Sequence, residues 1–220
     1  MKKQIVKKSF SEVFFLDYFN SLAEGDKSHC AEIVTELLSR NVDIKDIYTD
    51  LYQRSLYRIG KLWDEGKYSI AEEHSATQIT LHLINTILPK KSVKKKGKSA
   101  LITCIDKEYH EIGAKMVSNI FEFNGWNTRF LGSSVPAKEI LKFIRANKPE
   151  FVGLSFNLYL NLLRLYTVIE SIKKFFPDQK IIIGGQAAKQ EKKNLLKQFP
   201  DLLYFDSLHE LDEFIKSNSR

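Results

Sequence analysis

The sequence predicts an α/β protein with an all-α cap, in which an N-terminal four-helix bundle precedes a doubly wound parallel sheet of five strands. Up to Pro89, apolar residues recur every three or four positions, as they do along amphipathic helices. After residue 98, short β-rich runs alternate with helical stretches, which is typical of parallel strands joined by helices. We therefore expect a bundle at residues 1–89, a basic linker at 90–98 and a sheet domain at 99–220.

Four amphipathic helices are expected before Pro89. Their apolar periodicity covers residues 13–25, 31–40, 47–63 and 70–88. The short breaks between them contain glycine, asparagine or aspartate, which favour turns and helix caps. Loops this short place consecutive helices antiparallel, so the helices are expected to form a bundle.

Five strands are expected in the second half, at residues 99–105, 127–132, 151–156, 180–185 and 202–205. Helical stretches at 111–125, 136–147 and 162–176 lie between successive strands. This alternation predicts a flavodoxin-like sheet, whose ligands bind beyond the carboxyl ends of the strands. His110, Ser155 and Gly184-Gly185 all fall at or just after such ends.

The composition excludes several classes of protein. With 43% hydrophobic and 28% charged residues, the chain is expected to be soluble and globular. No apolar run approaches the ~20 residues that span a bilayer, and the N-terminus lacks a signal cleavage site.

The two cysteines, Cys30 and Cys104, are expected to be buried thiols in a reducing cytoplasm. Six lysines at residues 90–98 supply most of the net charge of +7, which favours a solvated linker over a phosphate-binding strip.

Three short patterns lie on the rim formed by the predicted strand ends. They are E-x-H-x-x-G at residues 108–113, S-x-N at 155–157 and G-G at 184–185. Each alone is equally typical of a loop histidine, a helix cap or a βα turn. Together they resemble the cobalamin-binding signature D-x-H-x-x-G, S-x-L, G-G, which methionine synthase, methyltransferase corrinoid proteins and B12-dependent photoreceptors share.

The resemblance implies a role for each of these residues. A neutral imidazole ligates a metal through one ring nitrogen when an acceptor fixes the other. By resemblance, His110 is the lower ligand of cobalt, and Glu108 accepts a hydrogen bond from its second ring nitrogen. Glycine leaves space for close approach because it has no side chain. The residues implied to contact the displaced nucleotide tail, or to leave room for it, are Ser155, Gly113, Gly184 and Gly185.

A second pattern, W-x9-E-H, joins the third and fourth predicted helices through Trp63, Glu73 and His74. With E-x-H-x-x-G, it resembles the light-sensing cobalamin-binding domains of MerR-type bacterial regulators, over essentially the whole chain. The resemblance implies that the bundle caps adenosylcobalamin. Trp63 would pack on the adenosyl group, Glu73 would accept hydrogen bonds from the nucleoside and His74 would line the pocket. From spacing alone, Trp63 is equally well a core aromatic, and Glu73-His74 an exposed helix start.

The sequence departs from these families at three positions. Glu108 replaces aspartate, and Asn157 replaces leucine. Asp64 stands where some photoreceptors carry a histidine that captures cobalt after photolysis, and His74 is a candidate substitute for that role. Because about eight residues precede the first predicted helix, we expect no helix-turn-helix domain and no direct DNA binding.

The leading hypothesis is a stand-alone, non-enzymatic cobalamin sensor without a catalytic residue. It responds to light or to B12 supply and signals to a separate protein partner such as a transcription regulator. Adenosylcobalamin is the favoured cofactor and methylcobalamin the alternative, and a homo-oligomer is compatible with the sequence. Two alternatives remain: a corrinoid carrier of a methyltransferase system, and an interaction module that has lost its cofactor. Glu108 and Glu73-His74 favour the sensor over the carrier.

Overall fold

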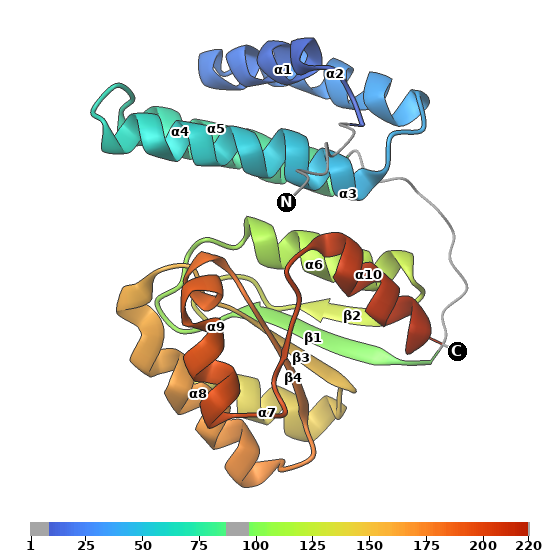
Figure 1. Ribbon diagram of the computed structural model, residues 1–220, viewed down its shortest axis with the longest axis vertical. Coiled ribbons are helices and arrows are strands. Elements are labelled where there is room, and N and C mark those ends of the chain that lie inside the picture. The colour runs from blue at the N-terminus through green and yellow to red at the C-terminus, as the bar shows by residue number, and fades with distance from the viewer. Residues whose placement is uncertain (1–8, 87–96, 220) are drawn as a thin grey trace, which may run out of the picture. The chain divides into compact units, whose positions relative to one another are not determined.

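The computed structural model describes residues 9–86 and 97–219. The chain divides into two compact units, Met1–Lys90 and Lys91–Arg220 (Figure 1). The first is helical and the second is a five-stranded parallel sheet with helices, which confirms the predicted fold class. Residues 90–96 of the predicted linker lie outside the described residues. No helix in the described ranges is long and apolar enough to cross a membrane.

Residues 9–86 of the helical unit contain four helical segments. They are α1 (Glu12–Glu24), α2 (Lys27–Ser39), a continuous third segment made of α3 (Ile44–Asp46), the π-helical η1 (Ile47–Gln53) and α4 (Arg54–Asp64), and α5 (Ile70–Thr86). The second and third segments begin about one turn earlier than the apolar periodicity predicts. Aspartate caps are the reason: Asp26 accepts a hydrogen bond from the His29 N–H, and Asp43 accepts one from the Lys45 N–H, each at 2.9 Å.

Tyrosine side chains form much of the core of the helical unit. Tyr18, Tyr48 and Tyr52 are buried, and the ring of Tyr52 lies 5.7 Å from that of Tyr18 and 6.0 Å from that of Tyr48. Cys30 is buried beside them, and burial raises the pKa of its thiol to about 12. The prediction that Cys30 is a buried thiol is therefore confirmed.

The strands of the second unit are β1 (Ser99–Cys104), β2 (Asn127–Phe130), β3 (Phe151–Ser155), β4 (Lys180–Gly184) and β5 (Leu203–Tyr204). All neighbouring strands pair in parallel, in the order β2-β1-β3-β4-β5. This is the flavodoxin-like order, in which the strand sequence reverses direction between β1 and β3. The ligand crevice of such a sheet lies outside the carboxyl ends of those two strands.

Helices cover both faces of this sheet (Figure 1). They are α6 (Ile112–Phe123), α7 (Ala137–Asn147), α8 (Leu162–Phe175), α9 (Gln186–Gln198) and α10 (Leu208–Ser217). The helices α6 and α10 pack together on one face, where Phe121, Trp126 and Phe151 form an aromatic cluster. On the other face, buried residues of α7, α8 and α9 join β3 and β4 in one hydrophobic core. This double cover fixes the strand ends that carry the predicted site.

Candidate functional site

The segment that carries His110 leaves the carboxyl end of β1 through a tight turn. The Glu108 N–H donates to the carbonyl of Ile105 at 3.0 Å and closes this turn. Lys107, inside it, has a left-handed φ of 61°, which is unfavourable for a residue with a side chain. Its N–H donates to Ser134 Oγ at 3.1 Å, so the loop after β2 holds the strained turn in place.

The Glu108 carboxylate is the centre of this loop. Its side chain is fully buried, and Oε1 accepts hydrogen bonds from His110 Nδ1 at 2.6 Å and from the His110 N–H at 3.1 Å. Oε2 accepts from the N–H groups of Asn157 and Leu158 at 2.8 and 3.0 Å. Burial alone would raise the pKa of Glu108, but these hydrogen bonds outweigh it and lower the pKa to about 2. Glu108 is therefore an ionised acceptor at neutral pH.

The imidazole of His110 is oriented by this carboxylate. Because an ionised Glu108 can only accept, Nδ1 of His110 is the donor, and in the neutral form of the ring the lone pair is then on Nε2. The His110 side chain is 59% exposed, although the Glu108 carboxylate that it contacts is fully buried. A histidine fixed in this way by a carboxylate has the tautomer and orientation that a metal ligand needs.

The sheet brings other predicted residues to the same edge. Ser155, 7% exposed at the end of β3, pairs in register with Gly184 at the end of β4. A Cβ atom added to Gly113 or Gly184 would meet nothing within 4 Å, so there is open space beside both. Gly185 differs, because its φ is +108° and an added Cβ would lie 2.2 Å from the Phe156 carbonyl oxygen. Gly185 is therefore required by the chain's own backbone.

One residue at this edge was missed as a site residue by sequence reasoning. Asn157 was treated only as a departure from a family pattern, yet its half-buried side chain bonds to three neighbours. It donates to the His110 carbonyl at 3.1 Å and to Ser155 Oγ at 3.3 Å, and it accepts from the Gln186 N–H at 3.1 Å. The available signal was an amide, which both donates and accepts, placed two residues beyond a strand end.

The remaining predicted residues lie in the helical unit, on α4 and α5. Trp63 is near the end of α4 with its side chain 46% exposed, so it is not a core aromatic. His74 Nδ1 lies 2.6 Å from Glu73 Oε2, and Glu73 also accepts a hydrogen bond from Thr77 Oγ1 at 3.0 Å. These contacts are all within the first turns of α5.

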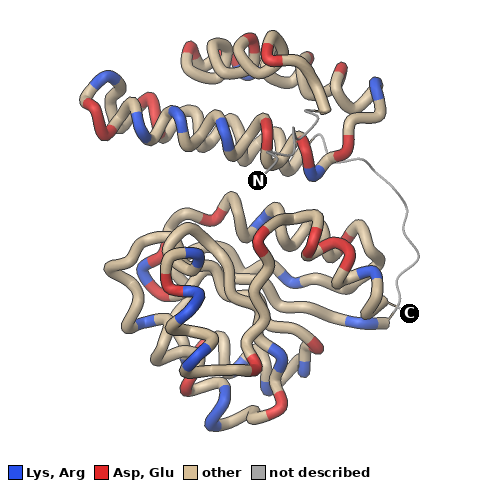
Figure 2. The backbone as a smooth tube through the Cα atoms, viewed as in Figure 1, with Lys and Arg blue, Asp and Glu red and all other residues tan. Residues whose placement is uncertain are grey.

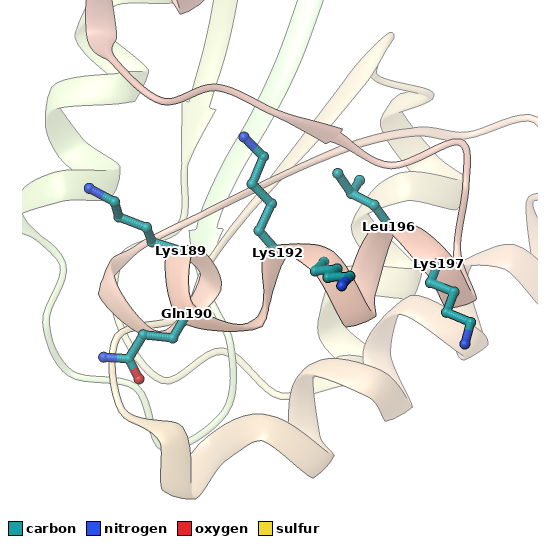
Figure 3. Close-up of a pocket in the computed structure, with 6 residues that line it drawn as sticks. Lys189, Gln190, Lys192, Leu196 and Lys197 are labelled. Carbon is teal, nitrogen blue, oxygen red and sulfur yellow. The ribbon is translucent and has the colours of Figure 1, made fainter. Parts of the chain in front are cut away.

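An open depression of about 600 Å³ lies along α9 (Figure 3). Lysines gather on this helix, whereas acidic residues dominate the first half of α10 (Figure 2). Lys192 donates to Asp206 at 2.7 Å, and its ammonium group lies 4.5 Å from the centre of the Tyr204 ring. The residues that line the depression include none of the predicted site: they are Lys189, Gln190, Lys192, Lys193, Leu196 and Lys197.

Family models match both units of the chain. Residues 98–206 match one model of a B12 binding domain, and residues 16–87 match a second model of that description. The chain belongs to the B12-binding family. Its cofactor is cobalamin, as the sequence predicts.

Relatives of this B12-binding protein fall into two groups. Trimethylamine corrinoid protein 2 of Methanosarcina mazei is 24% identical over 178 residues, which are 78% of this chain and 82% of that protein. The HTH-type transcriptional repressor CarH of Myxococcus xanthus is 24% identical over 130 residues, which are 59% of this chain but 43% of the repressor. Among solved structures, the monomethylamine corrinoid protein of Methanosarcina barkeri has a TM-score of 0.79 at 15% identity, covering 94% of this chain and 99% of that one, which shows a shared fold.

The residues at the sheet edge fit a cobalamin. His110 has an oriented imidazole at the carboxyl edge of the sheet, where it would ligate the cobalt of a corrin ring. The open space beside Gly113 and Gly184 is compatible with the cofactor's nucleotide tail. The donor set and the space at this edge therefore agree with the family.

Proposed function

We propose that this chain is a corrinoid carrier protein, which takes a methyl group from one methyltransferase and delivers it to another. One observation carries the proposal: the match to a trimethylamine corrinoid protein extends over 78% of this chain and 82% of that protein. At 178 residues, this match is longer than either unit and so includes parts of both. The sequence-based preference for a sensor, which rested on Glu108 and Glu73-His74, gives way to this longer match.

In the carrier, the residues of the chain hold and tune the cofactor. A bound corrinoid supplies a cobalt centre that accepts and releases a methyl group. His110 would provide a ligand to the cobalt through Nε2, and Glu108 keeps the ring in the required tautomer through the 2.6 Å contact to Nδ1. Because Glu108 is ionised and buried, it increases the basicity of the imidazole and thereby the strength with which it binds a metal.

Ser155, Gly113 and Gly184 are proposed to receive the nucleotide tail. Ser155 Oγ accepts a hydrogen bond from Asn157 and also interacts with the Cys104 thiol, and its hydroxyl is the group proposed to contact a polar atom of the tail. Gly185 is proposed to act indirectly, by letting β4 turn into α9 against the Phe156 carbonyl without a side chain in the way.

The carrier is tested with purified protein loaded with methylcobalamin and supplied with corrinoid methyltransferases. A carrier transfers the methyl group to the acceptor substrate, and His110→Ala lowers the rate by at least about tenfold. Wild-type protein that binds methylcobalamin but transfers no methyl group with any of the methyltransferases tested would exclude the carrier function.

A light- or B12-responsive sensor is the second candidate, because Trp63, Glu73 and His74 form the pattern of the light-sensing domains and a CarH repressor is among the relatives. In that case the three residues contact the upper ligand of adenosylcobalamin, and the partner is a separate protein such as a transcription regulator. Illumination of the adenosylcobalamin-bound protein should then change its absorption spectrum and its oligomeric state together. A change of spectrum without a change in assembly or partner binding would leave only photolysis of the bound cofactor and exclude the sensor.

A further inference from the structure

Asn157 occupies the position at which the cobalamin-binding signature has leucine, and its surroundings are polar. The side chain lies where the loop after β1, the end of β3 and the start of α9 meet. Its amide nitrogen donates to the His110 carbonyl at 3.1 Å and to Ser155 Oγ at 3.3 Å. Leucine could make neither of these hydrogen bonds.

The backbone of Asn157 holds the same histidine by a second route. The Asn157 N–H donates to Glu108 Oε2 at 2.8 Å, while Glu108 Oε1 receives His110 Nδ1 at 2.6 Å. Glu108 thus holds the ring and the main-chain N–H of His110, and the Asn157 amide holds the His110 carbonyl. The His110 carbonyl also accepts a hydrogen bond from the Cys104 thiol at 3.8 Å. Burial raises the pKa of this thiol to about 12, so it keeps its proton.

The acceptor end of the same amide explains why the residue is an asparagine. Gly185 precedes α9 and cannot carry a capping side chain, because a Cβ there would collide with the Phe156 carbonyl. The first N–H groups of a helix need an acceptor from outside the helix. Asn157 Oδ1 supplies one by accepting from the Gln186 N–H at 3.1 Å. An aspartate or asparagine at 157 can do this, but only asparagine can also donate to His110.

We propose that Asn157 is a positioning residue for the lower cobalt ligand: its side chain ties the His110 main chain to the N-terminus of α9. The inference rests on the proposed role of His110 in the carrier. Asn157 therefore acts through hydrogen bonds to the histidine loop, which leucine could not make. Its loss removes the amide's hydrogen bond to the His110 carbonyl while leaving the contacts of Glu108 to the ring and to the main-chain N–H.

Two substitutions separate the two ends of the amide. Asn157→Asp keeps the acceptor for the Gln186 N–H and loses the donor to the His110 carbonyl. Asn157→Leu loses both and restores the residue of the family signature. Asn147→Leu is the matched control, because Asn147 makes an exposed hydrogen bond to the Phe143 carbonyl at the end of α7.

The readouts are the dissociation constant for methylcobalamin, the fraction of cofactor with histidine coordinated in its visible spectrum, and the thermal midpoint of the cobalamin-free protein. Both Asn157 variants should raise the dissociation constant about tenfold and lower the coordinated fraction. Asn157→Leu should also lower the thermal midpoint, whereas Asn157→Asp should lower it less because the cap of α9 remains. Asn147→Leu should change none of the three.

Each result bears on a different claim. If wild-type protein shows no histidine coordination, the role of His110 itself is wrong. If wild-type protein shows it and both Asn157 variants retain the wild-type coordinated fraction and affinity, the positioning role of Asn157 is wrong. If Asn157→Leu does not fold, Asn157→Asp decides the question alone.

Discussion

The two units of the molecule each contain a glutamate–histidine pair, and the two pairs have the same separation. His110 Nδ1 lies 2.6 Å from Glu108, and His74 Nδ1 lies 2.6 Å from Glu73. The surroundings differ: the Glu108 side chain is fully buried, whereas that of Glu73 is 27% exposed. Glu108 also accepts backbone hydrogen bonds from a loop about fifty residues away, while the contacts of Glu73 stay within one helix.

This difference separates a preoriented imidazole from a contact within one helix. A buried carboxylate with several donors costs free energy to desolvate, so it holds one geometry strongly once those donors are in place. An exposed pair on a helix contributes little to stability and reorients easily. The sheet unit therefore fixes its histidine before the cofactor arrives, whereas the helical unit leaves Glu73 and His74 able to move.

The largest difference is expected for the glutamate-to-glutamine exchange in each pair. In Glu108→Gln, the new amide NH₂ faces backbone N–H donors, so we expect a loss of about 3 kcal/mol in unfolding free energy. Cobalamin affinity should fall about tenfold or more, since the orientation of His110 is lost. Glu73→Gln should change the unfolding free energy by less than about 0.5 kcal/mol. Urea denaturation measures the unfolding free energy of each variant, and cobalamin titration measures its affinity. Equal effects of the two exchanges would refute the comparison.

Acid should weaken the first pair selectively. The folded pKa of Glu108 is about 2, below the ordinary value of 4.5, so the ionised form stabilises the fold. This contribution is complete above about pH 4.5 and is lost as the pH falls towards 2. The unfolding free energy of the cobalamin-free protein should decline across that window, and the decline should be smaller in Glu108→Gln. An identical decline in the variant would assign the acid sensitivity to other carboxylates.

Alanine substitutions at Gly184 and Gly185 should distinguish a residue needed for the fold from a residue needed for cobalamin binding. Gly185→Ala places a Cβ against the Phe156 carbonyl in a left-handed conformation, so we expect a loss of about 2 kcal/mol in unfolding free energy. Gly184→Ala enters open space and should change this free energy by less than about 0.5 kcal/mol. If the nucleotide tail occupies that space, Gly184→Ala nevertheless weakens cobalamin binding. Unchanged affinity in Gly184→Ala would place the tail elsewhere.

The smallest effect on stability is expected at Trp63. Because its side chain is 46% exposed, Trp63→Ala should lower the unfolding free energy by less than about 1 kcal/mol. If Trp63 contacts the upper ligand, the affinity for adenosylcobalamin should fall more than that for methylcobalamin. Parallel titrations with the two cobalamins measure this ratio, and an unchanged ratio would remove Trp63 from the proposed site.

The fold could be predicted from the sequence because it depends on periodicity. The apolar repeat of the first half and the βα alternation of the second each recur over many residues, and they predict the bundle, the sheet and its strand order. Helix starts were predicted less well, since a single aspartate such as Asp26 or Asp43 extends a helix beyond its apolar repeat. The helices α9 and α10 were not among those named, and α9 is rich in lysine.

The sequence indicates which residues form the candidate site better than it indicates the hydrogen bonds that hold them. His110 and Glu108 are two positions apart, so they form a short pattern that can be recognised in the sequence. The partners of Glu108 include the backbone N–H groups of Asn157 and Leu158, which have no side-chain signature and lie on another strand end. The role of Gly185 was also hidden, because its contact with the Phe156 carbonyl depends on how two strand ends meet.

The central claim is that His110 ligates cobalt from below through Nε2. Electron paramagnetic resonance of the protein with cobalt(II) cobalamin, prepared with ¹⁴N- and with ¹⁵N-labelled histidine, tests it most directly. The account predicts that each cobalt line is a triplet with ¹⁴N-histidine and a doublet with ¹⁵N-histidine, and that His110→Ala abolishes the label's effect. A triplet that persists after labelling would show that the cofactor's own base remains bound to cobalt, and would contradict the account.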